Sequence, residues 1–305
     1  MKSYQRVFVF LLLVLLLTVV LSPWMAFAWE LFVRDRAGWE QYRVPFSRIF
    51  NRCFMIAGVI LFFACRRMIN VGSLAQLGFS PREHVAHDLT SGFALALASM
   101  IALVLVMTID DVFTPYFRLS LSASVERGTK ALLAAFTVAF LEAIFFQGIV
   151  FKGLYETASP YRAYVITNVF FAAIHFIQPG EKSVLTDFDP WAGLHYLVNS
   201  FGRFLDPATL LPGFIGLFLI GLVLSYAFVR TGTLYLSIAL HAGWVFSIKT
   251  VRVFGDYTRE DLGWFFGSTD PKIASGIVTW IGIGIVGLVV HVVTQHRARL
   301  TTQTG

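Results

Sequence analysis

The sequence contains few charged residues and very little cysteine. Only 14% of its 305 residues are Asp, Glu, Lys or Arg, whereas an ordinary soluble domain has about 25%. A chain with so little charge and so many apolar residues is not disordered, collagenous or a coiled coil. Cys53 and Cys65, the only cysteines, are too few for a disulfide framework or a cysteine zinc site. Both border or lie within an apolar stretch, and we expect them to be buried thiols.

Apolar and aromatic residues take the place of the missing charge. They make up 57% of the chain, against about 45–50% in a soluble domain, and the mean hydropathy is +0.71. Too little polar surface remains to cover a soluble protein, so the composition indicates a polytopic protein embedded in a lipid bilayer. The net charge is +6, but no segment carries a stripe of Lys and Arg, and we expect no nucleic acid partner.

Apolar stretches of about 20 residues, the length that crosses a bilayer, recur along the chain. They predict an all-α membrane bundle of about eight transmembrane helices, at residues 7–28, 46–65, 89–109, 131–154, 163–177, 211–229, 233–248 and 273–293. The first resembles a signal peptide, but bulky residues crowd its cleavage-like Ala26-Phe27-Ala28, and we expect an uncleaved helix. No internal repeat or linker divides the chain, so residues 1–305 are predicted to form a single integral membrane domain.

Residues 178–210 are too polar to form a span. Aromatic and aliphatic side chains recur there at about helical spacing, which predicts an amphipathic helix at the membrane interface, either a packed cap or a gate for lateral access from the lipid. The distribution of Lys and Arg among the loops favours both termini in the cytoplasm. We expect a bacterial inner membrane, since no eukaryotic targeting signal is present.

Three titratable residues lie inside expected spans. Glu142 is the only acid well within a span, and His175 and His241 lie in two others. All three are about 8 to 14 residues into their helices, so they could meet at a similar depth, and ionisable groups at that depth mark functional sites.

These three residues permit two kinds of chemistry. Glu142 can act as a general base on a water while the imidazoles share the proton or hold an oxyanion. Alternatively, the three side chains can bind zinc with an open fourth position. A third interpretation is that each group only forms a hydrogen bond to a neighbouring helix, but packing explains a lone mid-membrane Glu poorly, which favours a site. No Ser with a His partner stands out, so acyl-enzyme chemistry is not expected.

The order of these residues resembles the CPBP family of intramembrane endopeptidases, which includes the CAAX prenyl endopeptidases and the bacterial Abi proteins. That family carries Glu-Glu-x-x-x-Arg, Phe-x-x-x-His and His-x-x-x-Asn/Asp motifs on successive helices. The corresponding stretches here are Glu142-Ala143-Ile144-Phe145-Phe146-Gln147, Phe171-x-x-x-His175 and His241-x-x-x-Val245. The resemblance covers about residues 75–250. By α-helical spacing, Glu142 shares a helix face with Phe146, and Phe171 shares one with His175.

The resemblance implies a function and a role for each residue. Glu142 would activate the hydrolytic water, His175 would orient that water or share its proton, and His241 would stabilise the tetrahedral oxyanion. The substrate would be a membrane-embedded or membrane-tethered peptide or protein, and no cofactor is needed unless the three residues bind zinc. Supporting or substrate-binding positions would be Phe146, Gln147, Phe171, Trp244 and Val245.

Three positions depart from the family pattern. The family's second Glu is Ala143 and its Arg is Gln147, and replacing both members of a buried ion pair can be nearly neutral. Val245 stands where the family has Asn or Asp beside the oxyanion, and removing one such donor can cost about 10²–10³ in rate. The indole N–H of Trp244 is an alternative donor.

Two other functions remain compatible with the sequence. A catalytically degenerate relative would bind a membrane peptide without cutting it, as an immunity or accessory protein. A proton-coupled carrier would use Glu142 as its relay, although the absence of an inverted repeat disfavours it. His195-x-x-x-Asn199 also matches the third motif, but within the interfacial segment. The sequence indicates no particular oligomeric state.

Overall fold

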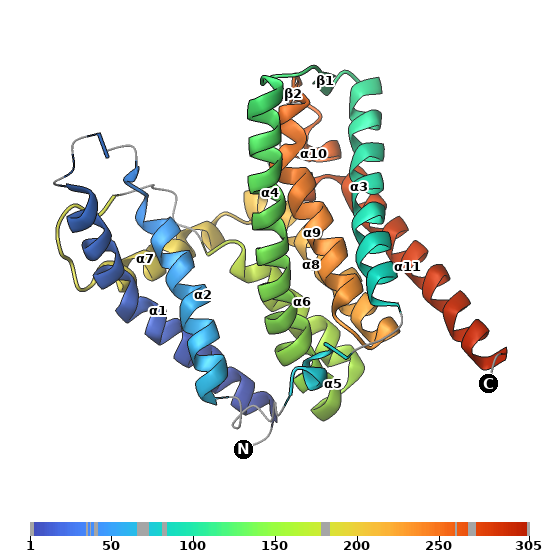
Figure 1. The fold of residues 1–305 in the computed structure, drawn as a ribbon, viewed down its shortest axis with the longest axis horizontal. Coiled ribbons are helices and arrows are strands. Elements are labelled where there is room, and N and C mark those ends of the chain that lie inside the picture. Colours follow the sequence, from blue (N-terminus) through green and yellow to red (C-terminus); the bar gives the residue numbers. More distant parts are fainter. Residues whose placement is uncertain are drawn as a thin grey trace. The chain divides into compact units, whose positions relative to one another are not determined.

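The protein is mostly helical, as the computed structural model in Figure 1 shows, with helices forming 81% of it. The structure describes residues 3–34, 36, 38–39, 42–65, 73–80, 84–177, 184–259, 261–267 and 273–303. By their contacts these form two compact units, one from residues 1–72 and 173–210 and the other from residues 73–172 and 211–305. The all-α class is confirmed, and the single domain expected from the sequence stays a prediction.

The first unit is built on two antiparallel helices, α1 (Ser3–Arg34) and α2 (Phe46–Cys65). It also contains α7 (Ala192–Ser200) and the short η4 (Phe201–Leu205). The Tyr196 ring of α7 packs on Phe46 and Phe50, with centroids 5.4 and 4.5 Å away. Gly193 lies so close to α1 that an added Cβ would be 2.1 Å from the Val19 carbonyl oxygen. A helix and a short 3₁₀ turn therefore form within the segment predicted to be amphipathic, while residues 178–183 lie outside the described part of the chain. The position of this helix at a membrane interface stays a prediction.

The second unit contains the remaining elements, except that the last two residues of α6 and the first four of α8 belong to the first unit. They are η2 (Ala75–Leu77), α3 (Val85–Ile109), β1 (Phe113–Pro115), α4 (Leu121–Glu142), η3 (Ala143–Phe151), α5 (Lys152–Thr157), α6 (Pro160–Ile174), α8 (Pro207–Thr231), α9 (Tyr235–Thr250), η5 (Val251–Val253), β2 (Gly255–Tyr257), α10 (Gly263–Phe266), η6 (Ile273–Ser275) and α11 (Ile277–Gln303). Helices α3, α4 and α9 run side by side in Figure 1, and α9 packs more extensively on α3 than on α4.

Small residues allow α3 and α9 to approach closely. A Cβ added at Gly92 of α3 would lie 2.9 Å from the Ala239 Cβ of α9, and one added at Gly243 of α9 would lie 2.5 Å from the Ala96 Cβ of α3. The two helices thus each present a pair of small residues four positions apart, a pattern that brings membrane helices into backbone contact. This crossing fixes the part of α9 that carries His241.

A buried polar seam joins α6 to α8. Ser225 of α8 donates a hydrogen bond to Oδ1 of Asn168 on α6 at 3.1 Å, and the Asn168 amide donates to the Tyr164 carbonyl oxygen at 2.8 Å. Gly221 faces the same amide, and a Cβ there would be 2.6 Å from Asn168 Oδ1. Hydrogen bonds between helices orient them in an apolar environment where backbone packing alone is not directional. The seam therefore sets the rotation of α6, which carries Phe171.

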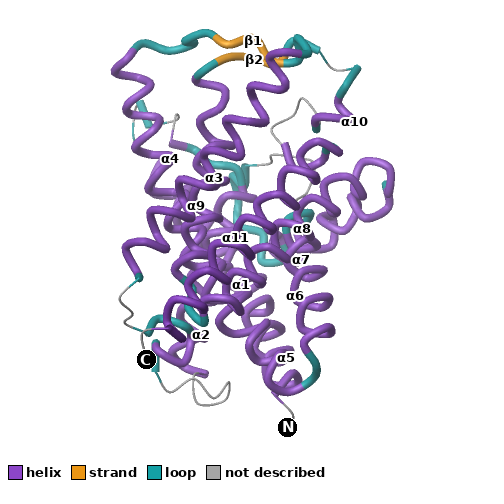
Figure 2. Tube along the Cα trace, turned by 90° about the vertical axis from the view of Figure 1, so that its right-hand side faces the viewer, coloured by secondary structure: helices purple, strands orange, loops and turns teal. Residues whose placement is uncertain are grey.

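A two-stranded antiparallel pair closes one end of the second unit, with Phe113 opposite Tyr257 and Pro115 opposite Gly255 (Figure 2). The Asp256 carboxylate on β2 accepts a hydrogen bond from the Tyr116 hydroxyl and lies 3.0 Å from Arg118 and 3.3 Å from Arg252. The Tyr116 hydrogen bond, followed by the two guanidinium groups, lowers the pKa of Asp256 below its usual value. These contacts connect the segment after α3 to the segment after α9.

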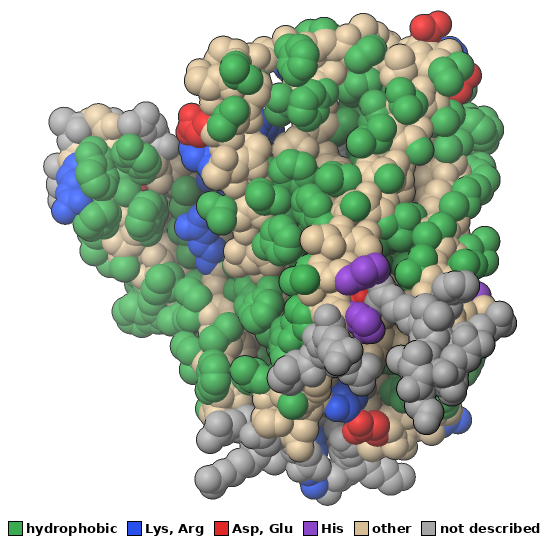
Figure 3. All heavy atoms as spheres, turned by 45° about the vertical axis from the view of Figure 1, so that its right-hand side comes forward, with side chains coloured by type: hydrophobic (Ala, Val, Ile, Leu, Met, Phe, Trp, Pro, Cys, Tyr) green, Lys and Arg blue, Asp and Glu red, His purple; other side chains and the backbone are tan. Residues whose placement is uncertain are grey.

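Among the described residues, six helices are long and apolar enough to cross a membrane. They include α2, whose bounds are the predicted 46–65, and a continuous helix of 37 residues from Leu121 to Thr157. Hydrophobic side chains cover much of the face drawn in Figure 3. Helices α6 and α9, at the fifth and seventh expected spans, have 15 and 16 residues, or about 23 and 24 Å, less than a hydrocarbon core of about 30 Å. The total of eight spans stays a prediction.

Enlarging Gly243 is expected to destabilise the second unit. In Gly243→Val the new side chain would overlap Ala96 and the Phe93 carbonyl oxygen, and overpacking of this kind costs about 1–3 kcal/mol. The melting temperature in detergent should therefore fall by several degrees. Gly284→Val on α11 is the matched control, because nothing lies within 4 Å of a Cβ at that position. Equal melting temperatures for the two variants would contradict the close crossing.

Candidate functional site

Glu142 lies where α4 changes from an α-helix to a π-helix. Residues Ala143–Phe151 form the π-helix η3, and at its end the Lys152 N–H donates to the Gln147 carbonyl, five residues earlier. Short π-helical segments within α-helices occur frequently at functional sites. The π-helix lies inside the stretch 131–154 that the sequence predicts as one span, and the shared helix face of Glu142 and Phe146 stays a prediction.

His241 of α9 faces Glu142. Its Nε2 lies 3.7 Å from Oε2 of Glu142, and the exposed fractions of the two side chains are 7% and 27%. This separation exceeds the 2.7–3.2 Å usual for an N–H···O hydrogen bond, so the two groups are close neighbours that are not hydrogen-bonded directly to each other. The structure thus brings two of the three residues expected at the site together.

Aromatic rings surround this pair. The Phe171 ring of α6 meets the His241 ring edge-on at a centroid distance of 6.0 Å, and Phe146 of η3 meets Phe171 at 5.0 Å. Phe146 and Phe171 are 3% and 1% exposed. Two helical segments, η3 and α6, therefore contribute to one apolar wall beside His241, and both of its rings come from the predicted motifs.

His175 lies directly after α6, four residues beyond Phe171, in a turn where the Phe176 N–H donates to the Ala173 carbonyl at 3.0 Å. Its side chain is half-buried. His175 belongs to the first unit, whereas Phe171 and His241 belong to the second. The part that His175 plays rests on the Phe-x-x-x-His motif.

The remaining predicted positions have other surroundings. Gln147 in η3 is 2% exposed, and Val245 is half-buried on α9. The Trp244 indole N–H donates to Oγ of Ser99 on α3 at 3.1 Å, so it is engaged in a bond between α3 and α9. We therefore do not assign it to an oxyanion. His195 of the alternative motif is 66% exposed and lies 3.6 Å from Asp189 in the first unit.

Among the residues that the structure describes, no group of three or more His, Cys, Asp or Glu side chains has a geometry that could hold a metal ion. The site instead combines one carboxylate and one imidazole with apolar walls. Such a pair can exchange a proton with a water and can donate a hydrogen bond to a developing negative charge.

Sequence reasoning missed the π-helix and the contact that accompanies it. Gly148 lies within η3, and a Cβ added there would be 3.2 Å from the Leu77 carbonyl oxygen of η2. The widened helix thus packs closely on the segment before α3. Gly148 was the one signal in the sequence, since glycine permits such a close approach, whereas its apolar neighbours suit an α-helix equally well.

Residues 127–247 match the family model described as type II CAAX prenyl endopeptidase Rce1-like. No curated protein and no solved structure matched the chain. The match includes all three motifs and confirms the resemblance to the CPBP family. The matching segment and the six long apolar helices together support an integral membrane protein and, at the level of the family, a membrane endopeptidase.

The bond between Trp244 and Ser99 can be measured by a double-mutant cycle. Trp244→Phe and Ser99→Ala each remove one partner, and the coupling energy between them should be about 0.6–1.5 kcal/mol in favour of the bond. Unfolding of the four proteins in mixed micelles gives this value. A coupling energy of zero would release the Trp244 N–H for another role, including the oxyanion.

Proposed function

We propose that this protein is an intramembrane endopeptidase of the glutamate type. It hydrolyses a peptide bond of a membrane-embedded or membrane-tethered peptide or protein, in a bacterial inner membrane with both chain termini in the cytoplasm. The observation that carries the proposal is the 3.7 Å approach of Glu142 and His241 within the segment that matches the endopeptidase family.

The separation of the pair suits a water that contacts both groups. A water oxygen about 2.8 Å from both atoms would complete a triangle with an angle of about 83° at the water. Polar groups more than 3.5 Å apart are commonly bridged in this way. Glu142 would then accept a proton from the water as its oxygen attacks the scissile carbonyl carbon. His175 would orient the water or share its proton, as the family motif implies.

Attack converts the carbonyl oxygen to an oxyanion. On this proposal His241 stabilises it, because an imidazole N–H in an apolar wall is a stronger electrostatic partner than it is in water. The carboxyl group of Glu142 then returns its proton to the leaving amine, and the peptide bond breaks. Water supplies the new hydroxyl and both hydrogens, so no cofactor is consumed.

Val245 makes the oxyanion site simpler than in the family. Its side chain has no hydrogen-bond donor, and the Trp244 N–H is bonded to Ser99. His241 is therefore the one side-chain donor that we assign to the oxyanion. We therefore expect this protein to hydrolyse its substrate more slowly than a relative with Asn or Asp at this position, since a single oxyanion donor contributes about 10²–10³ in rate.

Glu142→Gln is expected to abolish proteolysis while the protein remains folded, because the amide cannot accept the water proton at neutral pH. Peptide termini of the membrane proteome would be compared between cells that lack the protein and cells that express wild type or the variant. New termini should occur with wild type alone. The control is Glu126→Gln on the same helix, where the acid is 66% exposed and paired with Lys130.

The same comparison separates the competing functions. A protein that only binds a membrane peptide would show identical termini with wild type and Glu142→Gln, and its phenotype would survive the substitution. A proton-coupled carrier would lose its phenotype in Glu142→Gln without any change in the termini. Either result would overturn the endopeptidase.

Removal of metal ions is expected to leave the activity of the purified protein intact, because the proposed steps need only Glu142, His175 and His241. The measurement is cleavage of a substrate identified from the new termini, before and after treatment with a strong chelator. If activity disappeared and returned only with added zinc, the three residues would be metal ligands and the proposed role of Glu142 as general base would be wrong.

A further inference from the structure

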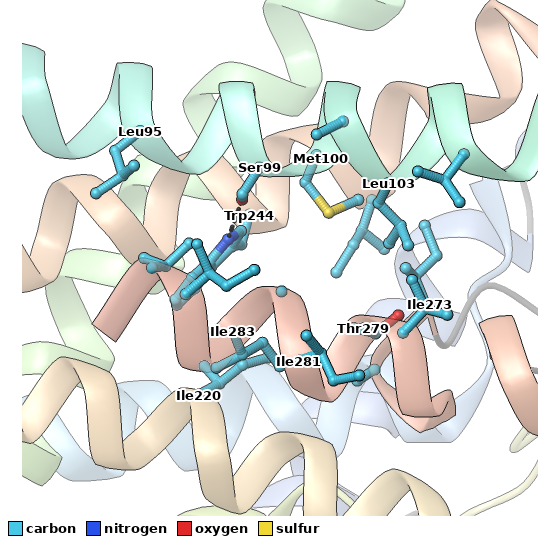
Figure 4. Close-up of a pocket in the computed structure, with 18 of the residues that line it drawn as sticks. Leu95, Ser99, Met100, Leu103, Ile220, Trp244, Ile273, Thr279, Ile281 and Ile283 are labelled. Carbon is cyan, nitrogen blue, oxygen red and sulfur yellow. Dashed lines mark hydrogen bonds between the residues drawn. The ribbon is translucent and has the colours of Figure 1, made fainter. Parts of the chain in front are cut away.

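A cavity lies on the side of α9 that faces α3 and α11. Its volume is about 300 Å³, and residues of α3, α8, α9, η6 and α11 line it. Figure 4 shows Leu95, Ser99, Met100 and Leu103 along one side and Ile281 and Ile283 along the other. Neither α4, η3 nor α6 contributes to its lining, so the cavity is separate from Glu142.

The cavity offers no free hydrogen-bonding group to a ligand. Three polar side chains line it, and each has a partner within the protein. Ser99 donates to the Ala96 carbonyl at 2.7 Å and accepts from Trp244, while Thr279 donates to the Phe266 carbonyl at 3.3 Å. No charged residue lines it. Since a buried polar group without a partner is costly, only a hydrocarbon can occupy this space without penalty.

The cavity opens between two membrane-spanning helices. At its edge, Ile281 and Ile285 of α11 are 59% and 54% exposed and Val106 of α3 is 40% exposed, whereas Trp244 and Ile283 deeper in the cavity are each 5% exposed. Both α3 and α11 are long and apolar enough to cross a bilayer. The opening therefore faces the hydrocarbon core of the membrane, where acyl chains are the surrounding molecules.

The volume suits part of one acyl chain. A dry apolar cavity of about 150 Å³ accepts benzene, so a cavity of about 300 Å³ accommodates a chain segment of about twelve carbons on the same scale. Moving an acyl chain from the lipid into the cavity gains no hydrophobic free energy, because both surroundings are apolar. Its binding would therefore depend on close packing and dispersion contacts.

We propose that this cavity binds one acyl chain of a membrane phospholipid. The occupant would contact Trp244, which lies one helical turn beyond His241 on α9. It would thereby pack against the side of α9 opposite to the Glu142–His241 pair. A lipid chain attached to a substrate is the less suitable occupant, because a peptide at Glu142 lies on the α4 side of α9 and its chain would have to pass around that helix.

Photo-labelling in nanodiscs tests this assignment on the full-length protein. The probe is phosphatidylcholine with a diazirine near the end of one acyl chain, diluted in unlabelled phosphatidylcholine, and mass spectrometry locates the cross-links. Trp244 should be labelled in wild type even though it is buried, and Leu288 on the exposed side of α11 (66% exposed) reports general contact with lipid.

Two glycines of α11 provide a matched pair of variants. A Cβ at Gly282 or at Gly284 meets nothing within 4 Å, but only Gly282 lines the cavity. Gly282→Leu should therefore fill the cavity and reduce labelling at Trp244 several-fold, while labelling at Leu288 stays at the wild-type level. Gly284→Leu should leave both unchanged.

Three results would overturn the proposal. Labelling of Trp244 could be absent in wild type, or it could be equal in Gly282→Leu and Gly284→Leu. In the third, a lipid-modified peptide with the diazirine in its own lipid would label Trp244 where phosphatidylcholine does not, which would assign the cavity to a substrate. The labelling requires no proteolysis, so its outcome is independent of the proposed endopeptidase activity.

Discussion

The close approach of α3 and α9 is the constraint on which the second unit depends. In a bilayer, apolar side chains gain little by leaving the lipid, so helices associate through tight packing and hydrogen bonds between them. Gly92 and Gly243 allow the two backbones to meet, and the Trp244 to Ser99 bond lies at the same crossing. This one contact holds α9 between the Glu142 pair on one side and the apolar cavity on the other.

The change of helix type after Glu142 is the second organising feature. A π-helix has a hydrogen-bond ladder of lower stability than an α-helix and persists only where the surroundings favour it. Here η3 is almost wholly buried, and Gly148 packs on the Leu77 carbonyl oxygen. Glu142 is the last residue of α4 and directly precedes η3, so the carboxylate stands next to the change of helix type in the chain.

The sequence predicted the fold class, the positions of the apolar helices and the order of the three motifs. Hydropathy locates membrane helices because a helix must be apolar over the thickness of the hydrocarbon core. Residues 46–65, for example, form α2 with the predicted bounds. The motifs led to Glu142 and His241, which the structure places 3.7 Å apart. The π-helix, the Trp244 to Ser99 bond and the cavity were not predictable, because each depends on contacts between residues distant in sequence. The predicted spans 163–177 and 233–248 have the same lengths as α6 and α9, 15 and 16 residues, and differ from them by two or three residues in position.

The two residues that replace the family's Glu–Arg ion pair are both buried in η3. Ala143 and Gln147, which replace the family's second Glu and its Arg, are each 2% exposed within η3. A single charge left at such a position would cost about 3–5 kcal/mol, whereas replacement of both partners by uncharged residues removes the burial cost together with the attraction. Neither residue belongs to the facing pair of Glu142 and His241. The substitutions therefore leave Glu142 and His241, the two groups that face each other at the site, unchanged.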